Sequence, residues 1–160
     1  MVRITSLKGS QLNYAKLQQE IDMTMSKEEQ QIIDYLYSRS DYSKKNLEEM
    51  PDIHAKAGAL EFQSHGGLLE VVMPHESKIK YDYFNVEPKH IETVKLADDA
   101  VAAMYYLSGN AKITGGPSIT NYAARVTEVF IKEGDSWKGR IGHWSPLFGQ
   151  AGLTTSFDPD

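Results

Sequence analysis

The sequence predicts an α+β protein, because helical patterns occupy its first third and strand patterns occupy the rest. Residues 26–40 repeat apolar side chains at helical spacing, whereas 60–73, 86–107 and 122–145 alternate apolar and polar residues between turn signals. No strand–helix–strand pattern follows, so the strands are expected to form an antiparallel meander.

Length and composition indicate one domain over residues 1–160, with 41% hydrophobic residues to build a core. We expect residues 1–24 to form an N-terminal extension with a helix over 11–22, and 148–160 to form a C-terminal tail. The absence of cysteine excludes disulfides and thiolate chemistry. A net charge of −5 without a basic cluster argues against nucleic acid binding. No apolar run is long enough to span a membrane, so a cytoplasmic protein is expected.

The helix signal in 26–40 begins with a capping box, in which Ser26 precedes Glu29 by three residues. Ile32, Ile33 and Leu36 then give a helical stripe. The helix is expected to end between residues 40 and 43.

Two hairpins and a connecting segment are expected before the final strands. Leu60 to Ser64 and Leu68 to Met73 alternate around Gly66-Gly67, which predicts the first hairpin. Residues 74–85 are polar and aromatic without periodicity, and we interpret them as a loop or short helix near the mouth of the sheet. Strands 86–96 and 100–107 flank a turn at Asp98-Asp99, which predicts the second hairpin.

The last hairpin joins strands 122–131 and 137–145 through a turn at residues 133–135. Trp137, Ile141 and His143 share one side of the second strand, which is therefore expected to be the side that a helix covers. A three-residue loop with Asp135 in the left-handed conformation would place odd-numbered residues opposite each other. This register puts Arg125 opposite His143 on the covered face.

The even-numbered face of strand 122–131 is nearly as apolar as the odd-numbered face, and Glu128 is its main interruption. A sheet that is apolar on both faces is expected to be covered on both, because large exposed apolar patches are uncommon on monomers. We therefore expect a homodimer that forms through the outer sheet face. Tyr122 and Trp144 are assigned to this outer face.

The order of elements between Ser26 and Leu147 resembles the nuclear transport factor 2-like superfamily, in particular its SnoaL-like branch. The segments that carry the resemblance are ARVTEVF, Trp137-Lys138, His143-Trp144-Ser145 and LADDAVAAMYY (residues 96–106). Similar endings occur in the calcium/calmodulin-dependent kinase association domains.

The resemblance implies a cone-shaped fold in which a curved antiparallel sheet wraps around N-terminal helices and encloses a pocket. It also implies dimerisation through the sheet. The family includes isomerases, dehydratases and cyclases as well as transport and assembly modules, so fold similarity leaves the function open. No position matches the aspartate base of the cyclases and steroid isomerases, so no catalytic residue is carried over.

Motifs of the common cofactor and metal enzymes are absent. The sequence has no glycine-rich nucleotide-binding motif, no nucleophile elbow and no zinc-protease motif. The histidines lack the short spacings that are typical of metal sites, and they occur at His54, His65, His75, His90 and His143. No cofactor and no metal are expected.

Arg125 is a candidate ligand-binding residue, because a guanidinium on a covered face must find an anion. That anion is either a carboxylate or phosphate of a ligand or an internal Asp or Glu, and the sequence does not decide between them. Thr127 shares this face and is assigned to the same ligand site or to a hydrogen bond with His143.

His143 and His54 are the candidate catalytic bases. An imidazole titrates near neutral pH, and Arg125 beside His143 would favour its neutral form. The alternative for His143 is a core histidine bonded to protein groups. For His54, which follows Asp52 by two residues, the alternative is a solvated loop position.

Aromatic side chains could line a pocket for a flat ligand, and Tyr35, Phe62 and Tyr105 are assigned to its wall. Glu61, on the strand before Gly66-Gly67, is expected to be an exposed edge carboxylate rather than an acid catalyst. Most aromatic residues are otherwise expected in the core or in dimer contacts.

Three function classes fit these observations. The first is a pocket protein that binds a small acidic or aromatic metabolite. The second is a cofactor-independent isomerase, dehydratase or cyclase that uses a histidine base. The third is a homo-oligomeric association module, which a cavity filled by the protein's own side chains would favour.

Overall fold

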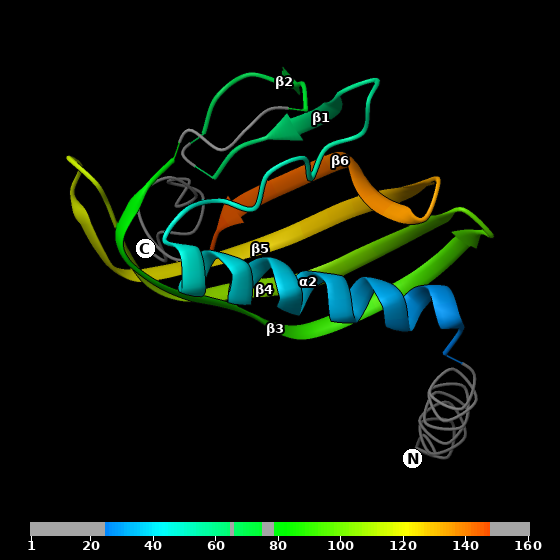
Figure 1. Cartoon of the computed structure of the whole chain (residues 1–160), viewed down its shortest axis with the longest axis horizontal. Coiled ribbons are helices and arrows are strands. Elements are labelled where there is room, and N and C mark those ends of the chain that lie inside the picture. Colours follow the sequence, from blue (N-terminus) through cyan, green and yellow to red (C-terminus); the bar gives the residue numbers. More distant parts are fainter. Residues whose placement is uncertain (1–24, 65, 75–78, 148–160) are drawn as a thin grey trace, which may run out of the picture.

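The computed structural model describes residues 25–64, 66–74 and 79–147, and in these ranges one helix covers one face of a six-stranded sheet (Figure 1). The predicted helix over 11–22 and tail over 148–160 lie outside them. The elements are α2 (Lys27–Asn46), β1 (Ala59–Phe62), β2 (Glu70–Val72), β3 (Tyr81–Ala97), β4 (Ala100–Ile113), β5 (Ser118–Glu133) and β6 (Ser136–Pro146). Their order across the sheet is β2-β1-β6-β5-β4-β3, which confirms the α+β class.

Helix α2 begins with the predicted capping box. Ser26 Oγ accepts a hydrogen bond from the Glu29 backbone N–H, and the Glu29 carboxylate accepts one from the Ser26 N–H. The helix continues beyond the predicted end to Asn46, where Leu47 adopts a left-handed conformation with φ of 55°. Ile32 and Leu36 are buried against the sheet.

Strands β3, β4, β5 and β6 form the predicted antiparallel meander, and β2 pairs antiparallel with β1. The pairing of β1 with β6 is parallel, so the sheet is mixed rather than wholly antiparallel. Residues 47–58 connect the end of α2 to β1. Strand β1 then pairs with the edge of β6 that β5 leaves free, and the two strands run in the same direction. Part of the segment predicted as a loop, residues 81–85, is the start of β3.

The hairpin of β5 and β6 has a two-residue loop instead of the predicted three-residue loop. Glu133 pairs with Ser136, and Gly134 takes the left-handed conformation with φ of 62°. Opposed positions therefore differ in parity, and a bulge between the Phe130–Gly139 and Val129–Ile141 pairs shifts the register again.

This register corrects the predicted orientation of the sheet. The side chains packed against α2 come from the even-numbered face of β5 and include Val126 and Phe130. Arg125 pairs with Ser145, and Thr127 pairs with His143. All four of these side chains lie on the outer face, where Arg125, Thr127 and His143 are exposed. The prediction that Arg125 and His143 face a covered cavity is wrong.

The core therefore lies between α2 and the concave face of β4, β5 and β6. Its buried members are Ile32, Leu36, Val101, Ala103, Tyr105, Val126, Phe130 and Trp137. Of the helical residues that the structure describes, no segment combines the length and apolarity needed to cross a membrane.

Candidate functional site

Two glycines of β6 lie on the concave face beside the polar groups of the candidate site. Gly142 pairs with Glu61 of β1 on one side and with Glu128 of β5 on the other, so these two carboxylates share one cross-strand row. The Trp144 ring lies over Gly142, where an added Cβ would come within 2.3 Å of a ring carbon. Gly139 accepts a hydrogen bond from the Ala55 N–H and donates one to the Ile53 carbonyl, which brings the segment around His54 onto the sheet.

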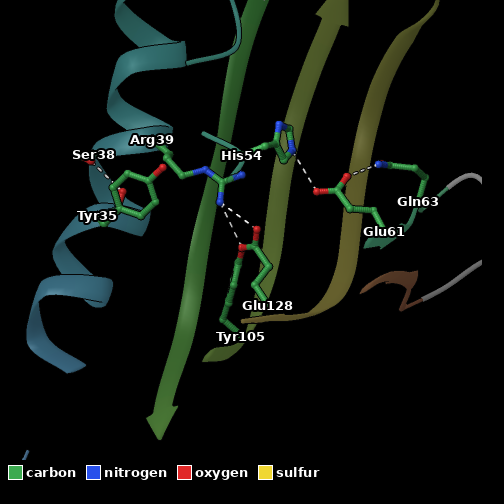
Figure 2. A network of polar contacts seen from close by, with 8 residues as sticks. All are labelled: Tyr35, Ser38, Arg39, His54, Glu61, Gln63, Tyr105 and Glu128. Carbon is green, nitrogen blue, oxygen red and sulfur yellow. Dashed lines mark hydrogen bonds and ion pairs between the residues drawn. The ribbon is translucent and has the colours of Figure 1, made fainter. Parts of the chain in front are cut away.

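Glu128 is held by residues from the helix and from a neighbouring strand (Figure 2). Arg39 Nη1 lies 3.0 Å and 3.2 Å from its two carboxylate oxygens, and the Tyr105 hydroxyl donates to it over 2.5 Å. Glu128 is 3% exposed and Tyr105 is 4% exposed. Burial of a carboxylate requires such partners, so this cluster connects α2, β4 and β5 through a desolvated ion pair.

The electrostatics of this cluster fix the protonation states of its donors. Burial raises the pKa of Tyr105 well above its ordinary value, and the nearby Glu128 carboxylate raises it further. Burial works to lower the pKa of Arg39, but Glu128, Tyr105 and Tyr35 together outweigh it and raise this pKa above its ordinary value. Tyr105 is therefore a hydrogen-bond donor and Arg39 a cation throughout the physiological pH range.

Glu61 forms a second polar cluster near the sheet edge. His54 Nε2 lies 3.0 Å from one of its oxygens, and Gln63 Nε2 donates to the other over 2.6 Å. Glu61 is 4% exposed, so the expectation of an exposed edge carboxylate is wrong. Its side chain points inward because β1 pairs with β6 in the register that places Phe62 beside His143 on the opposite face.

The two clusters differ in what they can do chemically. The carboxylate of Glu61 can fix the orientation of the His54 imidazole, which is an arrangement that general bases use. Glu128 is paired with a permanent cation and a hydroxyl donor, so it is suited to holding elements together. Figure 2 shows both clusters on the side of the sheet that α2 covers.

A groove of about 620 Å³ lies beside the first cluster, between α2 and the β5–β6 turn. Tyr35 and Trp137 contribute aromatic surface to it, and residues 50–52 close its third side. A second hollow of about 280 Å³ is lined by Phe62, Gln63, His143 and Trp144, among others, at the opposite end of β6. These two hollows therefore lie at opposite ends of β6.

The structure divides the predicted site residues between the two faces. Tyr35, His54 and Tyr105 lie on the helix side of the sheet, and of these three Tyr35 lines the groove of about 620 Å³. Phe62 is 43% exposed on the outer face, where its ring centroid lies 5.5 Å from that of His143. Because Arg125 is exposed, neither of its predicted alternatives, a cavity ligand or an internal ion pair, describes it. The same holds for His143 as a cavity base or a core histidine.

Sequence reasoning missed Arg39 as a partner of Glu128. A signal was present, since Arg39 follows Ile32 by seven residues and so occupies the buried stripe of the helix. Glu128 alone interrupts an apolar strand face, and such a carboxylate needs a cation from a facing element. Within the described ranges, no three His, Asp or Glu side chains gather closely enough to hold a metal ion.

Comparison with known proteins gives matches by structure alone. No family model and no curated protein matches the sequence. A solved structure of an NTF2-like protein of unknown function from Prochlorococcus is similar over 79% of this chain and 97% of its own, with a TM-score of 0.51 and 16% identity. A structure described as a candidate calcium/calmodulin-dependent kinase II association domain from Exiguobacterium sibiricum is similar over 79% of this chain and 98% of its own. Its TM-score is 0.56 and its sequence identity is 14%. An NTF2-like protein of unknown function from Pseudomonas putida is similar over 86% of this chain and 99% of its own, with a TM-score of 0.50 and 16% identity.

Proposed function

Since the chain has the nuclear transport factor 2-like fold, we propose that it is a homodimeric association module that pairs through the outer face of its sheet. The observation that carries this proposal is a row of aliphatic side chains that crosses all six strands on that face. Strand pairing aligns Val71, Leu60, Ile141, Val129, Ala102 and Val94 in this order. We call this set the aliphatic row.

Four members of the aliphatic row are exposed, whereas Val129 and Ala102 are half-buried. Val71 is 64% exposed, Val94 60% and Ile141 48%, and no described element packs over them. Apolar surface that continues across a whole sheet is unusual on a monomer and typical of an interface. A second copy is the occupant that fits, because a face presented identically by two chains can form a closed two-fold contact.

The neighbouring rows supply a mixed border for such an interface. Beside the aliphatic row, pairing aligns Phe62, His143, Thr127, Met104 and Glu92. Beyond them, Arg125 lies opposite Tyr106. An apolar centre with a polar rim is the usual anatomy of a protein interface. Arg125, Thr127 and His143 thus become candidate rim residues rather than ligand-binding residues.

Two further observations support association. Arg39 and Tyr105 lie between α2 and the sheet, and both are already bonded to Glu128. An interior occupied by such paired side chains favours an association module over a protein with a large ligand cavity. One of the similar structures is also described as a kinase association domain. The proposed interface lies on the outer face, where the sequence analysis expected one, but it consists of residues of the opposite strand parity.

Light scattering after size exclusion tests the proposal. The wild-type chain should elute as a dimer at micromolar concentration, and Ile141→Glu should elute as a folded monomer, because it buries a charge at the centre of the contact. Tyr37→Glu is the matched control, since Tyr37 is 47% exposed on α2 and lies away from the row. A wild-type monomer, or equal dissociation of both variants, would contradict the proposal.

A second candidate function is binding of a small molecule in the groove of about 620 Å³, to which the predicted wall residue Tyr35 contributes. Ser38→Tyr would fill part of this groove from the exposed surface of α2. Native mass spectrometry should then detect a co-purified small molecule on the wild-type protein and not on the variant.

An isomerase, dehydratase or cyclase activity would rest on His54 as the base, with Glu61 as the group that orients it. A cytoplasmic location stays a prediction from the sequence.

A further inference from the structure

The groove between α2 and the β5–β6 turn has two aromatic walls that are fixed in place. The Trp137 indole N–H donates to Gln31 Oε1 over 3.0 Å. The Tyr35 ring packs edge-on against Phe130, with centroids 5.8 Å apart and planes at 86°. Because packing and hydrogen bonds hold both rings, a ligand would meet a preorganised surface.

Each of the two rings already has one of the protein's own cations beside it. Arg39 Cζ lies 5.9 Å from the Tyr35 ring centroid, and Lys132 Nζ lies 5.7 Å from that of Trp137. These distances fall within the range of cation–π attraction. The charge of Arg39 is offset by Glu128, so it adds little repulsion toward a cation in the groove.

The charged groups of the groove favour a cationic ligand. Its lining contains Asp34, Asp52 and Asp135 against Lys138, and a second cation, Lys132, lies beside the Trp137 ring. Lys138 Nζ is already bound to Asp52, at 2.8 Å from its carboxylate and 2.5 Å from its carbonyl oxygen. Asp135 belongs to the exposed turn, and Asp34 accepts from Gln30 within its own helix. Two carboxylates therefore remain without a cationic partner among the described residues.

We infer that the groove binds a small organic cation, an ammonium group joined to an apolar body, with the ammonium between Asp34 and Asp135 and the body against Tyr35 and Trp137. The inference rests on the second candidate function, binding in this groove, and adds the class of ligand. It replaces the acidic metabolite expected from Arg125, since that side chain lies on the other face. Carboxylates at an aromatic surface attract ammonium groups by charge and by the ring quadrupoles together.

Isothermal titration with three probes of similar size tests the ligand class. Benzyltrimethylammonium should bind with a Kd on the order of 1 mM or below, whereas benzyl alcohol and benzoate should bind at least tenfold more weakly. The indole N–H resonance of Trp137 should shift only with the cation. Higher salt should weaken binding, because the carboxylates are exposed.

Variants locate the charge that matters. The double substitution Asp34→Asn and Asp135→Asn should weaken benzyltrimethylammonium about tenfold. Asp41→Asn is the control for charge loss on α2, because it removes one carboxylate at an exposed position outside the groove lining, as Asp34→Asn does within it. It should change affinity less than twofold.

The outcomes separate the ligand class from the groove itself. Tighter binding of benzoate or benzyl alcohol, with the Trp137 shift, would overturn the cation inference and leave groove binding standing. No binding of any probe at 10-fold the expected Kd would overturn both. If Asp41→Asn weakened benzyltrimethylammonium binding as much as the double substitution does, the preference for a cation would reflect only the net charge of the protein. That result would also overturn the inference.

Discussion

Glu128 is a single carboxylate in the apolar face of β5, and its partners come from two other elements. Arg39 reaches it from α2 and Tyr105 from β4, so one side chain fastens the helix and two strands together. A buried ion pair gains little over an apolar contact of the same shape, but removing one partner leaves an uncompensated charge. The cluster therefore makes the position of α2 sensitive to either residue.

Replacing Arg39 with Met should lower the free energy of unfolding by about 3 kcal/mol, because Glu128 would remain buried without its cation. Urea denaturation followed by circular dichroism measures this change. Lys45→Met, at an exposed position of the same helix, should stay within about 0.5 kcal/mol of wild type. Equal stabilities of the two variants would show that Glu128 is satisfied without Arg39.

Glu87 links β3 to α2 and should titrate at unusually low pH. Hydrogen bonds from Lys44 and then from Lys89 lower the pKa of Glu87 from 4.5 to about 2. A lowered pKa in the folded state means that this link stabilises the protein above pH 4.5, and that the contribution is lost as pH falls toward 2. Carboxyl carbon NMR should show the low midpoint in the wild type and a midpoint nearer 4.5 in Lys44→Met.

At the scale of elements, the β5–β6 hairpin shows what a strand pattern can and cannot predict. The two strands and the turn were predictable from β-branched residues around Glu133-Gly134-Asp135. The faces were not, because the bulge at Arg140 puts Trp137 and His143, which share one strand parity, on opposite faces of the sheet. Both faces of β5 are apolar, so hydrophobicity could not correct the error, and the bulge near Arg140 gave no separate signal.

The candidate site was predictable in part for the same reason. Tyr105 was placed on the helix side through its parity with Val101 and Ala103 on one strand, which needs no knowledge of a partner strand. Glu61 was misplaced because its burial depends on parallel pairing with β6, a contact between distant segments. Local periodicity reports which residues share a face, whereas burial depends on what covers that face.

The pairing of β3 with β4 contains a position that should accept only glycine. Gly109 has φ of 147°, and an added Cβ would come within 1.9 Å of the Asn85 carbonyl oxygen. Gly109→Ala should therefore lower the free energy of unfolding by roughly 2 to 3 kcal/mol through this clash. Gly115→Ala, at φ of 76° in open space, isolates the cost of the backbone conformation and should lower it by about 1 kcal/mol. A smaller effect at Gly109 than at Gly115 would refute this account.

At the scale of the whole molecule, the sheet has one covered and one open face. Helix α2 packs on the concave face (Figure 1). The aliphatic row lies on the other face together with Met104, which is 61% exposed. A sheet in this state gains stability from a partner, since apolar area removed from water contributes about 25 cal/mol per Å². The stability of the fold and its oligomeric state should therefore be linked.

The melting temperature should rise with protein concentration, because association stabilises the folded state by mass action. Scanning calorimetry at concentrations spanning about two orders of magnitude should show this rise for the wild type. The Ile141→Glu variant should melt at one temperature throughout. A concentration-independent melting temperature in the wild type would indicate that the open face is left unpaired in solution.

The parallel contact of β1 with β6 also has a consequence for biosynthesis. Leu60 meets Ile141 about eighty positions later in the chain, so the N-terminal hairpin has no edge to join while the polypeptide is still emerging from the ribosome. The meander from β3 to β6 must assemble first, and the hairpin closes the sheet last. Nascent chains halted before β6 should therefore leave the β1–β2 hairpin open to proteases and chaperones.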